Sequence, residues 1–532
     1  MRGHRQIGAA LLRATDKVAP AEVLGILVVL TAAGLIAYGS YIGQGGFYAD
    51  DWHHVAFYRF ADSPQYWSTV ETLSELLGGR PLVTLLMPLP QVFFGADVES
   101  HLALALVLGI VVSFCLYLAL RTLRMAPLHA GTIAVLALIF PRSDGVRLWA
   151  TGSILSISVI FFLLGLVLAL RGLKHPGRRG IAMHAGADAL YLLSVLTYEA
   201  TAGAAALAGA LYLGMTSTGR AVRLWLADLV VVMAALSYSL VTTSSHRGVG
   251  TWSERISDVG PFLRQSFLVL PDALLPVGAS GRVFQGLALL GVAAIVGAAV
   301  FRVRRGSEPA LRGWLLWIAG AAIAIAAAYV VFLGSHLYPQ DSGINTRIQV
   351  FAGLAYVVLA YAIVATACHL LLRSVVTAAL VTALAGATIA VGYGFRLAED
   401  QTLWKRAATE QQNVLRAIDG GLGTLPRRST LLAFNLPEDA GPGVPVFTQA
   451  FDLAGALQLH ANDPTLRAYP LYEGVSVQCE QKGLAVEGPG AYGTFDVNYR
   501  RTYFLDVRGG RGKMIRTPSA CAAALGRISR TR

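Results

Sequence analysis

Apolar blocks of about 18 to 25 residues recur from Ala21 to Phe395, and each has the length that a helix needs to cross the hydrocarbon core of a bilayer. Strands of a membrane barrel would instead alternate apolar and polar residues over about ten positions. Charged residues make up only 14% of the 532 residues, whereas about a quarter is typical of soluble proteins. These features predict an all-α polytopic membrane protein. We expect about eleven spans, near Ala21–Ile42, Ala96–Leu120, Leu128–Phe140, Trp149–Leu170, Ile181–Thr197, Ala200–Met215, Leu224–Val241, Val283–Val300, Gly313–Gly334, Ile348–Leu372 and Val375–Phe395.

Basic residues gather in every second loop between these spans, and short cytoplasmic loops are the ones that hold an excess of Lys and Arg. The basic segments are the N-terminus with Arg2, Arg5, Arg13 and Lys17, and the loops with Arg121 and Arg124, Arg171 to Arg179, Arg220 and Arg223, Arg302 to Arg312, and Arg373. The N-terminus is therefore predicted to be cytoplasmic, and an odd number of spans places the C-terminus outside. The net charge of +12 follows from this topology, and the sequence has no motif for nucleic-acid binding.

The sequence becomes polar beyond Arg396, which predicts a transmembrane domain over residues 1–396 and a soluble extracytoplasmic domain over residues 397–532. An amphipathic helix is expected over Leu403–Ile418. Short strands are expected at Thr430–Phe434, Val475–Cys479, Thr494–Tyr499 and Thr502–Val507. The C-terminal domain is therefore predicted to be a small α+β domain.

Cys479 and Cys521 are the only cysteines of this C-terminal domain. The predicted topology places them outside the cell membrane, where thiols can be oxidised, so we expect one disulfide between them. Two free thiols are the alternative, because sequence spacing alone does not fix disulfide geometry.

The first outer loop, Gly43–Arg80, opens with the run Tyr48-Ala49-Asp50-Asp51-Trp52. Adjacent carboxylates repel each other, which raises the pKa of at least one, and such a carboxylate is suited to act as a general base. If the segment is helical, His54 lies on the same face as Asp50. The alternative is that the two acids only cap an interfacial helix, since Asp is a common N-cap residue.

These residues resemble the acidic motif of the GT-C glycosyltransferase superfamily, which are polytopic enzymes that use lipid-phosphate-linked sugars. Three further segments fit the same family in order: Gly79-Arg80-Pro81-Leu82, Phe140 to Gly152 and Leu196-Thr197-Tyr198-Glu199-Ala200. The resemblance covers roughly Met1–Phe395. The sequence departs from the family pattern in having Asp144 where Glu is frequent, and in having a second Asp after Asp50. Which of Asp50 and Asp51 faces the active site is therefore open.

The resemblance implies a polyprenyl-phosphate sugar as donor, an acceptor hydroxyl on a glycan, lipid or protein, and Asp50 or Asp51 as the catalytic base. The departing phosphate needs cationic partners, for which the guanidinium fork of Arg is suited. The expected substrate-binding residues are His54, Arg80, Asp144, Arg147, Tyr198, Glu199, His246 and Arg247 in the loop Thr242–Arg282, and Arg347. The implied location is the bacterial inner (plasma) membrane.

Several alternatives stay open at the level of sequence. An Arg at the end of a span is often an interfacial anchor, and Glu199 fits the surface of a tight turn equally well. No cofactor is predicted, although Asp50, Asp51, His53 and His54 have the atoms to bind a divalent metal. A transporter or flippase of lipid-linked saccharides and a non-catalytic scaffold for envelope assembly are the rival functions.

Overall fold

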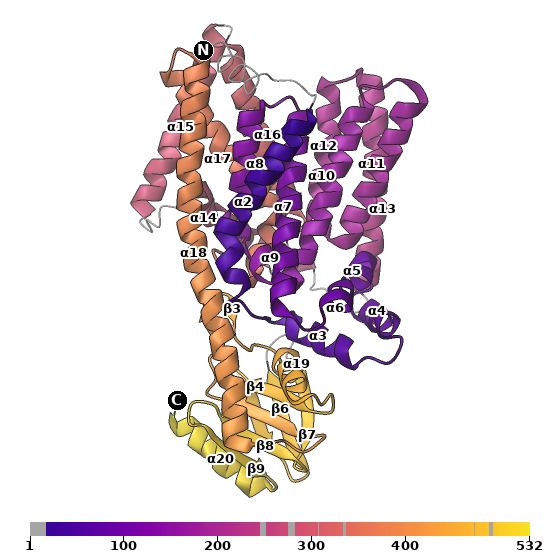
Figure 1. The fold of residues 1–532 in the computed structure, drawn as a ribbon, viewed down its shortest axis with the longest axis vertical. Coiled ribbons are helices and arrows are strands. Elements are labelled where there is room, and N and C mark those ends of the chain that lie inside the picture. Colours follow the sequence, from indigo (N-terminus) through magenta and orange to yellow (C-terminus); the bar gives the residue numbers. More distant parts are fainter. Residues whose placement is uncertain are drawn as a thin grey trace.

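The computed structural model describes residues 18–244, 252–274, 282–306, 308–333, 337–472, 474–488 and 493–531. A bundle of long helices forms one end of the molecule, and a smaller domain of strands and short helices forms the other (Figure 1). The short helices of the first outer loop lie at the end of the bundle that meets this smaller domain (Figure 1). These are α3 (Asp50–Phe60), α4 (Gln65–Leu76), α5 (Pro81–Leu86) and α6 (Leu89–Phe94).

Nine helices in the described part of the chain are long and apolar enough to cross a membrane, which confirms a polytopic helical protein. They are α2 (Pro20–Ile42), α7 (Val98–Thr122), α10 (Leu155–Gly172), α11 (Gly177–Thr197), α13 (Thr218–Ser244), α15 (Arg282–Arg305), α16 (Pro309–Val330), α17 (Val350–Leu371) and α18 (Val375–Leu422). The predicted number was about eleven. The other two predicted spans contain shorter helices, α8 (Pro127–Leu138) and α12 (Ala202–Ala208).

Helix α12 is shorter than the predicted span because a tertiary contact interrupts its series of backbone hydrogen bonds. The indole Nε1 of Trp225 donates a hydrogen bond of 2.6 Å to the carbonyl oxygen of Ala206, an acceptor that a continuing α-helix would give to residue 210. A 3₁₀ segment, Gly209–Gly214, follows at this point. Gly209 lies directly against the Trp225 ring, where a Cβ atom would be 2.1 Å from Cγ.

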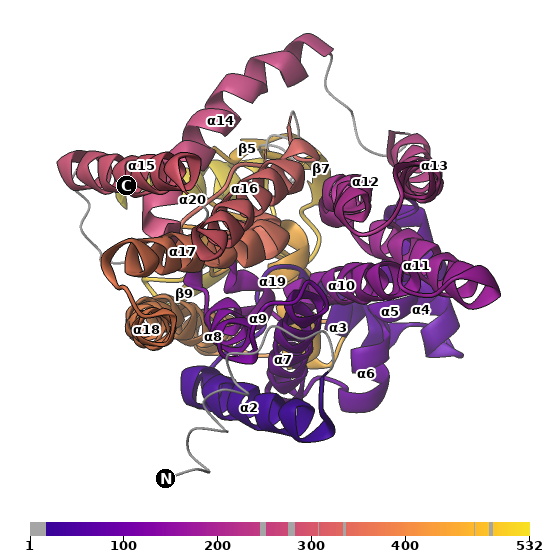
Figure 2. The ribbon, with the colours of Figure 1, turned by 90° about the horizontal axis from the view of Figure 1, so that it is seen from above.

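Helix α17 is the most buried of these nine helices, since other parts of the protein bury 89% of its most apolar window. Viewed from above, it lies between α16 and α18, with α15 beside it (Figure 2). Helices α2 and α13 lie at the periphery in the same view (Figure 2). Their exposed side chains include Leu24, Ile36, Val230 and Val241, as expected for surfaces that face lipid.

A single helix, α18, runs from Val375 to Leu422. It joins the span Val375–Phe395 and the amphipathic helix Leu403–Ile418, which the sequence predicts as two separate helices. The residues between them contain neither Gly nor Pro, so the change from apolar to polar residues near Arg396 does not interrupt the helix. The helix ends at Gly423, whose φ of +61° is accessible to glycine at little cost.

The predicted outer loop Thr242–Arg282 also contains a helix that the sequence did not indicate, α14 (Trp252–Leu274). Pro261 and Pro271 lie inside it. Proline usually interrupts a helix, which is why the sequence pattern there favours a loop.

The C-terminal domain contains a four-stranded sheet in the order β4-β1-β8-β9 and a three-stranded antiparallel sheet, β5-β6-β7. Strands β4, β1 and β8 are parallel, and β9 is antiparallel to β8. The strands are β1 (Thr430–Phe434), β2 (Asp439–Gly441), β3 (Val444–Pro445), β4 (Arg467–Leu471), β5 (Ser476–Cys479), β6 (Gly483–Gly488), β7 (Gly493–Asn498), β8 (Thr502–Asp506) and β9 (Arg511–Ile515). Two helices, α19 (Ala450–Ala461) and α20 (Pro518–Thr531), complete this α+β domain.

Cys479 at the end of β5 and Cys521 in α20 are joined by a disulfide, the pairing that the sequence predicts. Their Cα atoms are 6.0 Å apart. The bond ties α20 to the three-stranded sheet. Cys115 and Cys368 are buried free thiols within membrane helices.

Candidate functional site

The acidic run of the first outer loop forms a tight turn that leads into α3. Ala49 adopts a φ of +46° and a ψ of −118°, a conformation that is costly for a residue with a Cβ atom and that recurs at functional sites. Two hydrogen bonds hold the turn. The indole Nε1 of Trp149 donates to the carbonyl of Tyr48 at 3.0 Å, and the Tyr48 hydroxyl donates to the carbonyl of Trp404 at 2.8 Å. Trp149 and Trp404, from two distant parts of the chain, therefore fix the position of the two acids.

Asp51 is buried, with 2% of its surface exposed, although it is a carboxylic acid. One carboxylate oxygen accepts a hydrogen bond of 3.0 Å from the backbone N–H of Tyr48, and the other accepts one of 2.7 Å from the N–H of Thr151. Burial raises the pKa of Asp51 to about 7, and the neighbouring charge of Asp50 adds to the increase. The sequence predicted a raised pKa in this pair from mutual repulsion, but burial is the larger cause.

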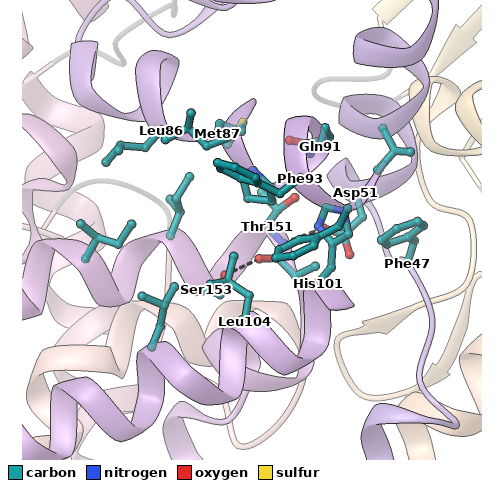
Figure 3. A pocket seen from close by; sticks show the side chains of 18 residues that line it. Phe47, Asp51, Leu86, Met87, Gln91, Phe93, His101, Leu104, Thr151 and Ser153 are labelled. Carbon is teal, nitrogen blue, oxygen red and sulfur yellow. Dashed lines mark hydrogen bonds between the residues drawn. The ribbon is translucent and has the colours of Figure 1, made fainter. Parts of the chain in front are cut away.

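Asp51 borders a cavity of about 250 Å³ (Figure 3). Most of its lining is apolar, with Phe47, Leu86, Met87 and Phe93 among the residues around it (Figure 3). The polar groups that line it are those of Asp51, Gln91, His101, Thr151 and Ser153. The ionisable carboxyl therefore faces an apolar cavity between the first outer loop and the starts of α7 and α10, an arrangement typical of a ligand site.

Asp50 does not line this cavity. It is the first residue of α3, is partly exposed and lies close enough to His53 and His54 to influence the charge of both. Burial lowers the pKa of His54 to about 4, so this side chain is neutral at pH 7. The N-cap of α3 is Ala49 and its side chain cannot cap, so neither acid occupies the capping position.

The face of α3 that points away from the Asp51 cavity packs against α19 of the C-terminal domain. The His53 and Phe451 rings are 5.6 Å apart, and Arg59 donates to the side-chain oxygen of Asn462 at 3.0 Å. Gly455 lies under the α3 backbone, where a Cβ atom would come within 2.6 Å of the Trp52 carbonyl oxygen. The C-terminal domain therefore supports the helix that carries Asp51.

Arg80 and Glu199, two predicted substrate-binding residues 119 positions apart, form an ion pair with each other. The Arg80 Nε donates to Glu199 Oε2 at 2.9 Å, and its Nη2 donates to the other carboxylate oxygen. The guanidinium also lies over the Tyr198 ring, 4.8 Å from its centre. This pair joins the end of the first outer loop to the turn after α11, and each charge is already compensated by the other.

Arg147 is also engaged within the protein. Its Nε donates to the Tyr38 hydroxyl at 2.6 Å and its Nη2 donates to the Phe140 carbonyl at 2.7 Å, which connects the second outer loop to α2. Asp144 is fully buried, and one of its oxygens accepts a hydrogen bond of 3.2 Å from Thr346. Burial raises the pKa of Asp144 above its ordinary value.

Another buried acid, Asp400 of α18, lies close enough to Asp144 for their charges to interact. The Arg396 Nη2 is 3.6 Å from the Oδ1 of Asp400. The sequence pattern places Asp400 in the predicted soluble domain, where no role is predicted for it. Its position is visible only once α18 is known to continue past Arg396 at the membrane boundary.

Arg347 has a different environment from the other predicted arginines. Its guanidinium lies 5.3 Å from the centre of the Trp149 ring, whose indole N–H holds the Tyr48 carbonyl. The side chain is partly exposed, and no carboxylate of the described residues lies within ion-pair distance. His246 and Arg247 lie outside the described residues. Of the predicted cations that are described, Arg347 is the one that contacts Trp149, although it does not itself line the Asp51 cavity.

Comparisons with known proteins find a likeness in structure but none in sequence. No protein-family model matches the chain, and no curated protein matches it in sequence. The chain is similar in structure to ArnT from Cupriavidus metallidurans, solved as a crystal structure in the apo state. The match has 12% sequence identity and a TM-score of 0.36, and it covers 83% of this chain and 85% of that chain. A likeness at this level spans most of both chains but transfers no residue's role to this protein.

Proposed function

We propose that this protein is a membrane glycosyltransferase that transfers a sugar from a polyprenyl-phosphate-linked donor to an acceptor hydroxyl, with Asp51 as the general base. The observation that carries the proposal is the buried carboxyl of Asp51 at the wall of an apolar cavity, with a pKa of about 7. A general base works best when its pKa lies near the operating pH. The basic loops favour the extracytoplasmic side of the membrane for this reaction.

In the proposed reaction, Asp51 accepts the proton of the acceptor hydroxyl while the oxygen forms a bond to the anomeric carbon of the sugar. The bond between that carbon and the phosphate oxygen breaks, and polyprenyl phosphate leaves with the electron pair. The carboxylate keeps lone pairs for this step, because the N–H groups of Tyr48 and Thr151 occupy only two of about four acceptor positions. The same two hydrogen bonds fix its orientation.

The donor lipid suits the side of the cavity formed by α6. Val92 and Phe93 of this helix are exposed apolar residues, with Phe93 74% exposed, and both neighbour Gln91 at the cavity wall. Exposed apolar side chains at this end of the bundle give an isoprenoid chain a surface to contact as it enters from the bilayer. Arg347 is the proposed partner of the leaving phosphate, because Arg80 is already paired with Glu199.

The acceptor is proposed to approach along α3, where a series of hollows leads from the cavity to the C-terminal domain. Val55 borders both the Asp51 cavity and a hollow of about 370 Å³, and Phe60 borders that hollow and one of about 450 Å³ against α19. Arg467 and Tyr469 border this third hollow and a polar one of about 500 Å³. Arg428 and Arg500 also line the polar hollow, which favours an elongated anionic glycan as the acceptor.

Reversing one charge in the polar hollow tests this route. Arg467→Glu is expected to raise the KM for an anionic polymeric acceptor about tenfold, with kcat unchanged. The change removes an attraction that contributes equally to the bound acceptor and to the transition state. The KM for a short neutral acceptor should not change. Arg416→Glu, an exposed substitution on α18, is the matched control. An equal effect of both substitutions would exclude a specific acceptor route through this hollow.

The function itself is tested by transfer of a radiolabelled sugar from a panel of polyprenyl-phosphate sugars to envelope glycans by the reconstituted protein. Asp51 must be ionised to accept a proton, so the rate should fall about tenfold per pH unit below pH 7 and level off above it. His54 should not contribute to this profile, because its pKa is about 4. Movement of labelled lipid across the membrane without transfer of its sugar would contradict the enzyme and support a flippase.

A further inference from the structure

A cluster of ionisable side chains lies between membrane helices, away from the cavity described above. His184 and Asp188 are one turn apart on α11, and Asp228 belongs to α13. These two helices are neighbours (Figures 1 and 2). His184 is 13 residues before the end of α11 at Thr197, which corresponds to about 20 Å along the helix from the end that meets the Arg80–Glu199 pair. The proposed glycosyl transfer makes no use of these residues.

The charges of this cluster are not balanced by the protein. Asp228 is fully buried and Asp188 is half-buried, and in the part of the chain that the structure describes no Lys or Arg lies within ion-pair distance of either. The one cationic partner available is His184, if it is protonated. Two carboxylates in a membrane interior are costly, and such groups mark sites that bind a compensating charge.

The positions of the three side chains match those of metal ligands. His184 Nε2 is 3.0 Å from Asp228 Oδ1 and 3.9 Å from Asp188 Oδ1, and the three ligand atoms all lie within 4.8 Å of one another. Tetrahedral ligands at about 2.0 to 2.2 Å from a zinc ion are about 3.3 to 3.6 Å apart. Small side-chain movements would therefore place one ion in contact with all three.

Unsatisfied polar atoms around the cluster point to a missing partner. Among the described residues, Asp188 Oδ1 is buried and accepts no hydrogen bond, and Asp228 Oδ1 accepts no well-aligned one, although His184 Nε2 lies 3.0 Å from it. The other oxygen of Asp228 accepts a hydrogen bond of 2.7 Å from Tyr212, which orients the carboxylate as outer partners do in metal sites.

We infer that His184, Asp188 and Asp228 bind a divalent transition-metal cation that joins α11 to α13 within the bilayer. One imidazole nitrogen and two carboxylate oxygens suit zinc or manganese better than magnesium or calcium, which prefer oxygen ligands alone. A charge of +2 neutralises both carboxylates while His184 stays neutral, as a metal ligand must be.

The test uses the full-length protein, purified in detergent with a tag that contains no histidine, stripped with EDTA and then equilibrated with Zn²⁺. Elemental analysis of the wild type should give one more bound zinc per chain than Asp228→Asn. Thermal unfolding should show a saturable stabilisation of the wild type by Zn²⁺ or Mn²⁺, weak or absent with Mg²⁺, and absent in Asp228→Asn. Asp400→Asn, which removes a different buried carboxylate, should keep the full metal response.

Asp188→Asn, at the half-buried edge of the cluster, serves if Asp228→Asn does not fold, and it should also lose the response. In metal-free buffer these variants should be at least as stable as the stripped wild type, because they remove repulsion between carboxylates. Equal zinc content and equal stabilisation in wild type and both variants would overturn the inference. The inference would also be overturned if the stripped wild type did not respond to any of the three cations, because protons alone would then neutralise the two carboxylates.

Discussion

Asp51→Asn is expected to lower the rate of sugar transfer by about 10³-fold while the protein still folds and inserts into the membrane. Asparagine has the same shape, and its side-chain oxygen can still accept the hydrogen bond from Thr151, whereas the one from the Tyr48 N–H is lost because an amide nitrogen does not accept. However, a neutral amide cannot take the proton of the acceptor hydroxyl. The substitution also removes a buried charge, so it should not unfold the protein. Initial rates at saturating donor, measured at matched amounts of reconstituted protein, give the result.

Asp50→Asn is the matched control, because it makes the same chemical change one residue away. Asp50 is partly exposed and does not line the cavity. The transfer rate of the Asp50→Asn variant should therefore stay within about threefold of the wild-type rate. A similar loss in both variants would mean that the two acids act as a unit. Full activity of Asp51→Asn would remove the general base from the proposed mechanism.

Arg347→Ala is expected to lower kcat/KM for the lipid-linked donor by about 10²-fold, because it removes the cation proposed to stabilise the leaving phosphate. Arg347→Lys should recover only part of the loss, since an ammonium group keeps the charge but lacks the planar pair of donors. Stacking on Trp149 would be lost in the alanine variant as well. The circular dichroism spectrum and thermal unfolding of each variant therefore need to be compared with wild type.

The control for Arg347 is Arg80→Ala combined with Glu199→Ala. This double variant removes a cation from the same end of the molecule together with its compensating acid, so no unpaired charge remains. It should retain more transfer activity than Arg347→Ala. The assignment of the phosphate partner would be contradicted if Arg347→Ala kept wild-type kcat/KM or if the double variant were the more damaged of the two.

The sequence by itself determined the class of the protein and much of its secondary structure. Spanning helices can be predicted from apolar blocks because bilayer thickness fixes the length of such a helix. Helices α2, α7 and α17 accordingly lie close to their predicted positions. The strand Thr430–Phe434 was predicted with the bounds that the structure has, because a short apolar run between turn residues depends mainly on local sequence. The disulfide partner of Cys479 followed from there being one other cysteine in the domain.

Only the tertiary structure decided which neighbouring side chains form a site. Asp50 and Asp51 are equivalent in sequence, and the contacts of Thr151 and Trp149 with the turn are what direct Asp51 alone into the cavity. The pairing of Arg80 with Glu199 likewise depends on packing between segments that are distant in the chain. Burial, which gives Asp51 a pKa of about 7, is a property of the surrounding helices and not of the residue. Local sequence therefore sets which segments span or pair, whereas charge compensation and desolvation arise only when those segments meet.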